Sequence, residues 1–484
     1  MIMKISRLVV VIFLFLFRFS TLIAQVNFPS FISDNMVLQR ETEAQIWGNS
    51  EPNSSVKISC SWDEIKYVTT ANELGKWQIK VKTPVAGGPH SIQVNKINIE
   101  NVMIGEVWIC SGQSNMQMSL SQSENCKEEL ANAELPNIRL FYVARQLADK
   151  PQEDCYGKWV ECSPESAKTF SAVAYYFGKK LYQELGVPIG LIHTSWGGST
   201  AQAWVKQDIL KADSDYDCYY DVEEQKELRA KPGIIPITHH SPSRLYNAMI
   251  HPLMPYRIKG VIWYQGESNQ DYCPGDPKRY EKLFPELIYS WRDEWKLGDF
   301  PFYYVQIAPF PRRITNVGAL LRDAQRKSLN VPNTGMVVTL DIGDIKDIHP
   351  KNKKDVGQRL ALWALAKDYG RTSLVYSGPL YKSLEIKGSK AIVSFDEIGS
   401  GLMSKDETLS GFEIAGKNKV FYPAKARIKE EIVMVWSDKI GKPVSVRYAF
   451  HNTSEASLFN KEGLPVSSFR TDNWEVKIEP VIKE

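Results

Sequence analysis

The sequence predicts an α/β protein, in which helices flank a parallel sheet and both chain ends add β-rich domains. Between residues 101 and 370, apolar strand-like runs alternate with amphipathic helical segments. This alternation is typical of parallel strands joined by crossover helices. Short β-rich runs occupy residues 25–100, and strand-like runs return over residues 371–484.

Length and charge limit the class of protein. The 484 residues exceed one ordinary hydrophobic core, so about three domains are expected. A composition of 43% apolar and 24% charged residues is typical of a globular protein. With 59 basic against 56 acidic residues, the net charge of +3 favours neither nucleic acid nor an anionic membrane as a partner.

Residues 1–24 have the pattern of a secretory signal peptide. Lys4 and Arg7 precede the apolar stretch Leu8–Phe17, and the small Ala24 precedes Gln25. Arg18 interrupts an apolar run that is already shorter than the roughly 20 residues of a membrane-spanning helix. The sequence therefore predicts a secreted or periplasmic protein with no membrane attachment once the signal is removed.

Residues 25–100 predict a small β-sandwich. The runs "SVKISCSW", "KWQIKV" and "HSIQVNKINI" are separated by the turn signals "EPNSS", "NELGK" and "VAGGP". The seven cysteines of the chain form no C-x-x-C pair. Cys126, Cys155 and Cys162 are close enough in sequence for one local disulfide, and the odd total leaves at least one thiol free or paired between chains.

Residues 101–370 carry the alternating elements of the central domain. The expected strands are 102–110, 189–195, 259–265, 302–308 and 335–341, and the expected helices are 171–185, 276–295, 318–329 and 353–369. Residues 206–241 are polar and rich in turn signals, and they interrupt this order. Such a long excursion is expected either over the substrate face or as a peripheral lobe.

Three of the expected strands end in glycine-serine turns. These are Gly112-Gln113-Ser114, Gly197-Gly198-Ser199 and Gly266-Glu267-Ser268. A tight turn with a helix-capping serine explains any one of them alone. Because ligands bind beyond the carboxyl ends of parallel strands, three such turns together favour a common site. The nearby Trp196, Trp204 and Trp263 suit either sugar stacking or the core.

A nucleophilic serine needs a base, and His349 is the best-placed histidine. It follows the last strong strand, precedes a helix, and has acids near it at Asp341, Asp344 and Asp347. His193 lies inside an expected strand and fits the core. The Asp341–His349 segment is the one weak metal alternative, and since the chain has no H-E-x-x-H we predict neither a metal nor a cofactor. The absence of G-x-S-x-G argues against an ordinary α/β-hydrolase.

Acyl transfer also needs donors for the developing oxyanion. Gly197 and Gly198 can bring backbone N–H groups close to a ligand because they lack a Cβ. The amides beside the turns are further candidates for oxyanion or substrate contacts: Gln113, Asn115, Gln265 and Asn269.

Five stretches together resemble the SGNH hydrolase superfamily and, within it, the sialate O-acetylesterase family of carbohydrate esterases. They are "FISDNMVLQR" with "AQIWG", "GEVWICSGQSNM", "SWGGSTAQAW", "LYNAMIHPL" with "GVIWYQGESN", and "DIHPKNKKDVGQRLA". They extend over roughly residues 30 to 365. The resemblance implies an SGNH-hydrolase-like, flavodoxin-like sheet with an additional β-rich domain.

The resemblance also implies catalytic roles for particular residues. Ser114 is the implied nucleophile, His349 the base, and Gly198 an oxyanion donor beside the Ser114 N–H. Two positions depart from the superfamily pattern. The acid expected three residues before the histidine is Lys346 here, which leaves Asp347 or Glu267. Ser268 stands where the superfamily has an asparagine donor, so that role would fall to Gln265 or Asn269.

We therefore expect a secreted carbohydrate O-acetylesterase that forms an acetyl-serine intermediate, with an acetylated sugar, favoured as sialic acid, as its substrate. Arg244 or another exposed arginine would bind a sialate carboxylate. Acetylated xylan or another acetylated glycan is the alternative within this class. A non-catalytic glycan-binding protein is the alternative outside it, although such a protein would be expected to have lost Ser114 or His349.

Overall fold

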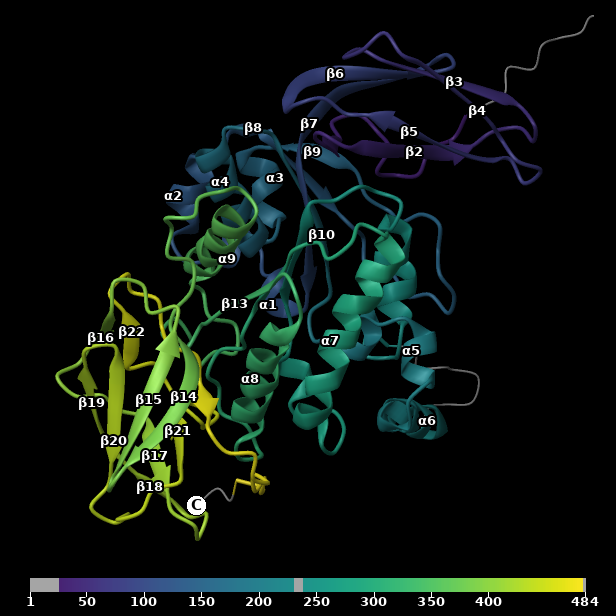
Figure 1. Ribbon diagram of the computed structural model, residues 1–484. Coiled ribbons are helices and arrows are strands. Elements are labelled where there is room, and N and C mark those ends of the chain that lie inside the picture. Colours follow the sequence, from purple (N-terminus) through teal and green to yellow (C-terminus); the bar gives the residue numbers. More distant parts are fainter. Residues whose placement is uncertain (1–25, 230–237, 482–484) are drawn as a thin grey trace, which may run out of the picture.

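The computed structural model describes residues 26–229 and 238–481. The predicted signal peptide, residues 1–24, lies outside them. Figure 1 shows a central layered part, a β-rich part at the N-terminal end and a second β-rich part at the C-terminal end. The α/β fold class with β-rich additions is thereby confirmed.

The central sheet has the strand order β13-β12-β11-β7-β10-β8-β9. Neighbouring strands are parallel except for β8 and β9. The strands are β7 (Ile97–Gly112), β8 (Leu135–Tyr142), β9 (Trp159–Cys162), β10 (Ile189–Ser195), β11 (Gly260–Tyr264), β12 (Phe302–Val305) and β13 (Thr334–Val337). All five expected strands form. The sequence did not predict β8, because Pro136 and Arg139 interrupt its apolar run.

Helices cover both faces of this sheet. Trp108 and Cys110 of β7 share a core cluster with α4 (Ala172–Leu185) and α9 (Lys353–Lys367). Val107 and Ile109 point to the other face and share a cluster with α7 (Asp276–Trp295) and α8 (Val317–Lys327). Burial on both faces explains why the strands are continuously apolar. No helix among the described residues is long and apolar enough to cross a membrane.

The shorter helices connect these layers. They are α1 (Ser114–Gln117), α2 (Cys126–Ala131), α3 (Pro164–Thr169), α5 (Gln207–Lys211) and α6 (Asp217–Arg229). The last two belong to the excursion predicted over residues 206–241, of which residues 230–237 lie outside the described part. Tyr219 of α6 is buried and donates a hydrogen bond to Asp276 Oδ1 at 2.7 Å. The excursion is therefore partly helical and packs on the first turn of α7.

The N-terminal part is a sandwich of two β layers. Its strands are β1 (Val37–Gln39), β2 (Glu43–Asn49), β3 (Ser55–Cys60), β4 (Lys66–Thr70), β5 (Lys76–Lys82) and β6 (Gly87–Val94). β2 pairs with β5 in one layer, while β1, β3, β4, β6 and the first half of β7 form the other. β7 then continues into the central sheet. It pairs with β1 and β6 up to Gly105, and with β10 from Glu106. The boundary predicted at residues 100–101 therefore lies inside a strand.

The C-terminal part consists of antiparallel strands. Its two four-stranded sheets have the orders β14-β15-β20-β19 and β18-β17-β21-β23, and β16 pairs with β22. The strands are β14 (Leu380–Lys387), β15 (Lys390–Asp396), β16 (Leu402–Ser404), β17 (Phe412–Ala415), β18 (Phe421–Pro423), β19 (Lys425–Lys429), β20 (Ile432–Trp436), β21 (Ser445–Tyr448), β22 (Leu458–Asn460) and β23 (Phe469–Arg470). Buried Asp323 of α8 accepts from Arg470 Nε at 2.9 Å, which ties this part to the central domain.

All seven cysteines are free thiols in this structure. The local disulfide considered among Cys126, Cys155 and Cys162 therefore does not form here. Burial raises the pKa of the Cys162 thiol to about 12, so it packs as a small apolar side chain.

Candidate active site

The three glycine-serine turns converge, as predicted, at the carboxyl ends of adjacent strands. In the register of β7 with its neighbours, Gly112 is opposite Ser195 of β10 and Tyr264 of β11. The Gln113 N–H donates to the Tyr264 carbonyl at 2.9 Å, and the Trp196 N–H donates to the Gly112 carbonyl at 3.1 Å. These bonds fix the first turn between the other two.

Gly112 allows the sharp turn that places Ser114 after β7. Its φ is +139°, and a Cβ at this position would lie 2.2 Å from the Tyr264 carbonyl oxygen. Only glycine fits this close approach of two backbones. Ser114 then becomes the first residue of α1 and remains half-buried.

The hydroxyl of Ser114 is in hydrogen-bond contact with His349. Ser114 Oγ and His349 Nε2 lie 2.8 Å apart, although 235 residues separate them in the chain. His349 belongs to the loop between β13 and α9, and its side chain is 43% exposed. A hydroxyl and an imidazole at this distance form a nucleophile-base pair that substrate can reach from solvent.

Of the two candidate acids, Asp347 is the one next to the imidazole. Asp347 Oδ1 lies 3.8 Å from His349 Nδ1 and accepts the His349 backbone N–H at 2.9 Å. Glu267 is buried, and its Oε1 accepts from Asn115 Nδ2 at 2.6 Å. Its other oxygen, Oε2, has no hydrogen-bond partner within the described part of the chain.

A buried polar cluster lies beneath the Ser114–His349 pair. Asn115 Nδ2 donates to Glu267 Oε1 and to the carbonyl of Ile348 at 3.1 Å, while Asn115 Oδ1 accepts from Lys353 Nζ at 2.6 Å. Burial lowers the pKa of the Lys353 ammonium to about 7, although Glu267 and Asp347 act in the opposite direction. Asn115 thus links the first turn, the third turn and the His349 loop.

The predicted backbone donors differ in availability. The Gly197 N–H donates to Gln117 Oε1 at 2.5 Å, so it already has an acceptor. No hydrogen bond from the Gly198 N–H is found within the described residues, and φ at Gly198 is +80°. The N–H of Ser114, at the start of α1, has no intrahelical acceptor. Gly198 and Ser114 therefore each have an N–H group with no acceptor in the described part of the chain, and these can bind an oxyanion.

The remaining predicted amides bond within the protein. Gln113 Oε1 accepts the N–H groups of Gly266 and Ser268, both at 3.2 Å. Gln265 Nε2 donates to Asn269 Oδ1 at 2.8 Å, and both side chains are fully buried. Their role as oxyanion or substrate contacts stays a prediction, and for Gln265 it would require the Nε2 donor to exchange its present acceptors.

Among the tryptophans beside the turns, only Trp196 is partly exposed. Trp204 and Trp263 are buried in the core, which was the alternative left open for them. Trp196 stacks on His239 with ring centroids 5.4 Å apart, and the exposed Arg145 guanidinium lies 5.6 Å from the Trp196 ring centroid. Arg244, considered for a substrate carboxylate, instead forms an ion pair with Asp149.

Two further expectations concern His193 and the acids before His349. His193 is buried in β10, as expected for a core histidine, with Nε2 2.6 Å from Ser195 Oγ. Asp341 forms a bidentate pair with Arg359 at 2.8 and 2.6 Å. Within the described residues, no group of three or more His, Cys, Asp or Glu side chains is arranged to hold a metal ion.

Three residues of the site were not predicted from the sequence: Gln117, Arg145 and Lys353. Gln117 lies one helical turn after Gln113, and this spacing could have suggested that it reaches the neighbouring turn. Lys353 follows His349 by four residues at a helix start, where a buried lysine is rare. Arg145 lies outside every motif, and nothing in the sequence indicates its place.

The fold is that of a carbohydrate esterase. Residues 104–366 match the family model described as "Carbohydrate esterase, sialic acid-specific acetylesterase". The chain is 31% identical to sialate O-acetylesterase of Mus musculus, over 88% of this chain and 89% of that protein. It is 34% identical to the Homo sapiens enzyme of the same name, over 76% of each chain.

A solved structure supports the carbohydrate esterase class. The chain is similar to a carbohydrate acetylesterase from Xanthomonas citri, with a TM-score of 0.83 and 36% identity over 93% of this chain and all of that one. The chain therefore belongs to the sialic acid-specific acetylesterase family of carbohydrate esterases, as its sequence motifs predicted.

Proposed function

We propose that this esterase removes O-acetyl groups from sugars through an acetyl-Ser114 intermediate. The observation that carries the proposal is the 2.8 Å contact between Ser114 Oγ and His349 Nε2 at the convergence of three strand ends. Ser114 Oγ attacks the acetyl carbonyl carbon while His349 Nε2 takes its proton. Asp347, beside Nδ1, stabilises the resulting imidazolium.

The tetrahedral intermediate carries its charge on the former carbonyl oxygen. The N–H groups of Ser114 and Gly198 are the donors we assign to it. When the intermediate collapses, His349 returns the proton to the leaving sugar oxygen. Water, activated by the same imidazole, then attacks the acetyl group, releasing acetate and restoring the serine hydroxyl.

The substrate we propose is an O-acetylated sialic acid. The mammalian relatives are sialate O-acetylesterases, which supports this choice. The position of Arg145 supports it as well. Its exposed guanidinium lies next to Trp196, which directly precedes Gly197 and Gly198. Arg145 would bind the sialate carboxylate while the sugar ring lies against the half-buried indole. An acetylated neutral glycan, such as acetylxylan, is the alternative, because the Xanthomonas citri structure is described only as a carbohydrate acetylesterase.

The first experiment is hydrolysis of p-nitrophenyl acetate by the wild type and Ser114→Ala. We expect substitution to lower kcat at least about 10³-fold. Ser119→Ala is the matched control, since Ser119 is also half-buried but bonds to Gln122 rather than to a histidine. Equal activity of Ser114→Ala and the wild type would rule out Ser114 as the nucleophile.

The second experiment separates the substrates. With 9-O-acetylated sialic acid, Arg145→Ala should raise KM about tenfold or more, because a charged hydrogen bond is lost. With acetylated xylo-oligosaccharides, the same substitution should leave KM unchanged. If the wild type hydrolyses only the xylo-oligosaccharide, the sialate assignment is wrong and the neutral-glycan alternative stands.

We also propose export of the mature chain, on the strength of the signal pattern in residues 1–24. Mass spectrometry of the protein from cell fractions tests this. A mature N-terminus near Gln25 in the periplasm or medium is the expected result, and an uncleaved cytoplasmic chain would contradict it.

A further inference from the structure

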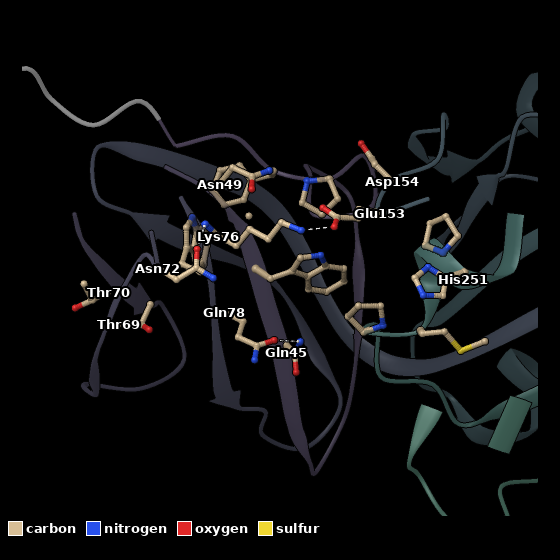
Figure 2. Close-up of a pocket in the computed structure, with 18 residues that line it drawn as sticks. Gln45, Asn49, Thr69, Thr70, Asn72, Lys76, Gln78, Glu153, Asp154 and His251 are labelled. Carbon is tan, nitrogen blue, oxygen red and sulfur yellow. Dashed lines mark hydrogen bonds and ion pairs between the residues drawn. The ribbon is translucent and has the colours of Figure 1, made fainter. Parts of the chain in front are cut away.

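A cleft lies between the N-terminal sandwich and the central domain, away from the three turns. It has a volume of about 580 Å³. One wall is formed by the pair β2 and β5, and the other by residues 153–154 and 251–255 of the central domain. Figure 2 shows Gln45, Gln78 and Lys76 on the sandwich side, with Glu153 and His251 toward the central domain.

The register of β2 and β5 places alternate side chains on the cleft wall. Trp47 is opposite Gln78, and Asn49 is opposite Lys76. Because side chains alternate along a strand, Gln45, Trp47 and Asn49 lie on the same face of β2. Gln78, directly opposite Trp47 in β5, lies on that face too. The neighbouring positions Ala44 and Ile46 are buried on the inner face of the sandwich.

The wall presents hydrogen-bonding groups that the protein does not use. Gln45 Nε2 donates to Gln78 Oε1 at 2.9 Å, which leaves the Gln45 Oε1 acceptor and the Gln78 Nε2 donor without a partner in the described part of the chain. Asn72 Oδ1 accepts the N–H groups of Leu74 and Lys76, so its Nδ2 remains a free donor among these residues. Both donors and acceptors are therefore available, as a ligand rich in hydroxyl groups requires.

Two indoles accompany these amides. Trp47 is half-buried. Its ring centroid lies 5.2 Å from that of Phe31 and 6.4 Å from that of Tyr256, and these contacts fix the position of the indole. Trp77 also lines the cleft and is only 3% exposed. Its Nε1 has no hydrogen-bond partner among the described residues. Trp77 alternates with Lys76 and Gln78 in β5, so its side chain belongs to the inner face of the sandwich, and Trp47 is the indole available to a sugar ring.

The charges of the cleft indicate what kind of ligand it takes. Lys76 forms an ion pair with Glu153, and the Asp154 carboxylate accepts from the backbone of Ser30 and Cys155. No unpaired arginine or lysine lines the cleft among the described residues. An anionic sugar would therefore find no cation here, whereas uncharged sugars would meet amides, hydroxyls and an indole.

We propose that this cleft is a carbohydrate-binding site for a neutral oligosaccharide segment, separate from the active site. The indole of Trp47 lies against a sugar ring, and the amides of Gln45, Gln78 and Asn72 bond to its hydroxyl groups. None of the predicted catalytic or oxyanion residues lines the cleft. Figure 1 shows β2 and β5 well away from α1, which begins at Ser114. Binding here would hold a glycan chain to the enzyme and raise the local concentration of its acetyl groups.

The test measures binding without turnover. Full-length Ser114→Ala protein is run on native gels that contain soluble, chemically deacetylated xylan, mannan or β-glucan, with polysialic acid as the anionic comparison. We expect at least one neutral polysaccharide to retard the protein and polysialic acid not to. Adding Trp47→Ala should weaken the association about tenfold or more, because a buried aromatic contact is lost.

Two controls keep the test decisive. Trp62→Ala removes another half-buried indole of the sandwich, whose Nε1 donates to the Lys82 carbonyl outside the cleft, and should bind like the parent. The double variant Gln45→Ala/Gln78→Ala removes two amides whose loss leaves the core intact. If Trp47→Ala fails to fold, polysaccharide binding by this double variant tests the proposal instead. In a chain with Ser114 intact, this double variant should hydrolyse p-nitrophenyl acetate at the wild-type rate.

Two results would overturn the proposal: no neutral polysaccharide retards the protein, whether or not polysialic acid does, or binding is unchanged in both cleft variants. Because binding is measured with an inactive protein and deacetylated glycans, its outcome does not depend on the esterase mechanism proposed above.

Discussion

Lys353 Nζ donates a 2.6 Å hydrogen bond to Asn115 Oδ1, and neither side chain is exposed to solvent. This contact joins the start of α9 to the residue that follows Ser114. Since His349 lies four residues before Lys353, the bond holds the loop of the base against the turn of the nucleophile.

The buried Lys353 ammonium makes stability depend on pH. The Lys353 pKa is about 7 in the folded protein and about 10.4 in the unfolded chain. Between these values the unfolded state binds more protons, so the free energy of unfolding rises with pH, by up to about 1.4 kcal/mol per pH unit. Below pH 7 Lys353 is charged in both the folded and the unfolded state, so the folded protein bears the full free-energy cost of burying the ammonium. In urea titrations from pH 7 to 10, the free energy of unfolding of the wild type should rise relative to that of Lys353→Met. A constant difference between the two proteins would contradict this.

Asn115→Ala should impair turnover more than substrate binding. The substitution removes the bonds to Ile348 and Glu267 that position the His349 loop. We expect kcat for p-nitrophenyl acetate to fall about 10²-fold with KM within about twofold, since a misplaced base affects the chemical step. Asn132→Ala is the control, because Asn132 bonds only to the backbone at the end of α2. A change confined to KM would show that Asn115 contacts substrate instead.

The two candidate acids can be separated by isosteric amides. Asp347→Asn keeps the size of the side chain but removes the charge 3.8 Å from His349 Nδ1. We expect its kcat to fall about 10² to 10⁴-fold. Glu267→Gln retains an acceptor for Asn115, so its kcat should fall less than tenfold. The reverse order, measured on p-nitrophenyl acetate at pH 8, would make Glu267 the acid.

Gly112→Ala should destabilise the protein strongly. A Cβ there would meet the Tyr264 carbonyl at 2.2 Å, at a φ of +139°. Strain and overpacking together should cost about 3 kcal/mol or more. Gly186→Ala also has a positive φ, +64°, but nothing lies within 4 Å of its Cβ, so it should cost only about 1 kcal/mol. Thermal unfolding of both variants tests the comparison, and equal losses would mean that the close contact relaxes.

His193 should contribute to acid sensitivity. Burial, with a smaller effect from Arg145, lowers the pKa of His193 to about 3. Its unfolded pKa is about 6.5, so the stabilisation present above pH 6.5 is lost as the pH falls toward 3. His193→Gln cannot take up a proton, and its stability deficit relative to the wild type should shrink between pH 7 and 4. A deficit that stays constant over this range would show that His193 is not protonated on unfolding.

The elements with a strong pattern were predictable from sequence, and those built by tertiary contacts were not. The helix expected at residues 276–295 forms over those residues as α7, because its apolar positions recur at the helical period. β8 was missed because buried Arg139 is tolerated only through its partners Asn35, Asn101 and Glu161, which come from distant segments.

In the candidate active site, too, some features could be predicted from the sequence and others depend on tertiary contacts. Strand-end position predicted that the Ser114 and His349 regions would meet, since parallel strands align their carboxyl ends. The sequence did not predict that Asn115 would bond to Lys353, because that contact depends on how α9 returns to the sheet. For the same reason the amides of Gln265 and Asn269 could not be distinguished in advance from substrate donors.

The continuity of β7 has a mechanical consequence. The same strand belongs to the N-terminal sandwich up to Gly105 and to the catalytic sheet from Glu106. No loop interrupts the strand at this junction, so it constrains how the two parts lie relative to each other, and a cut at residue 100 would remove pairing from the sandwich. A glycan bound against the wall formed by β2 and β5 would thereby be held within a limited range of distances from Ser114. Along a polymer chain, that range would determine which acetyl groups reach the serine.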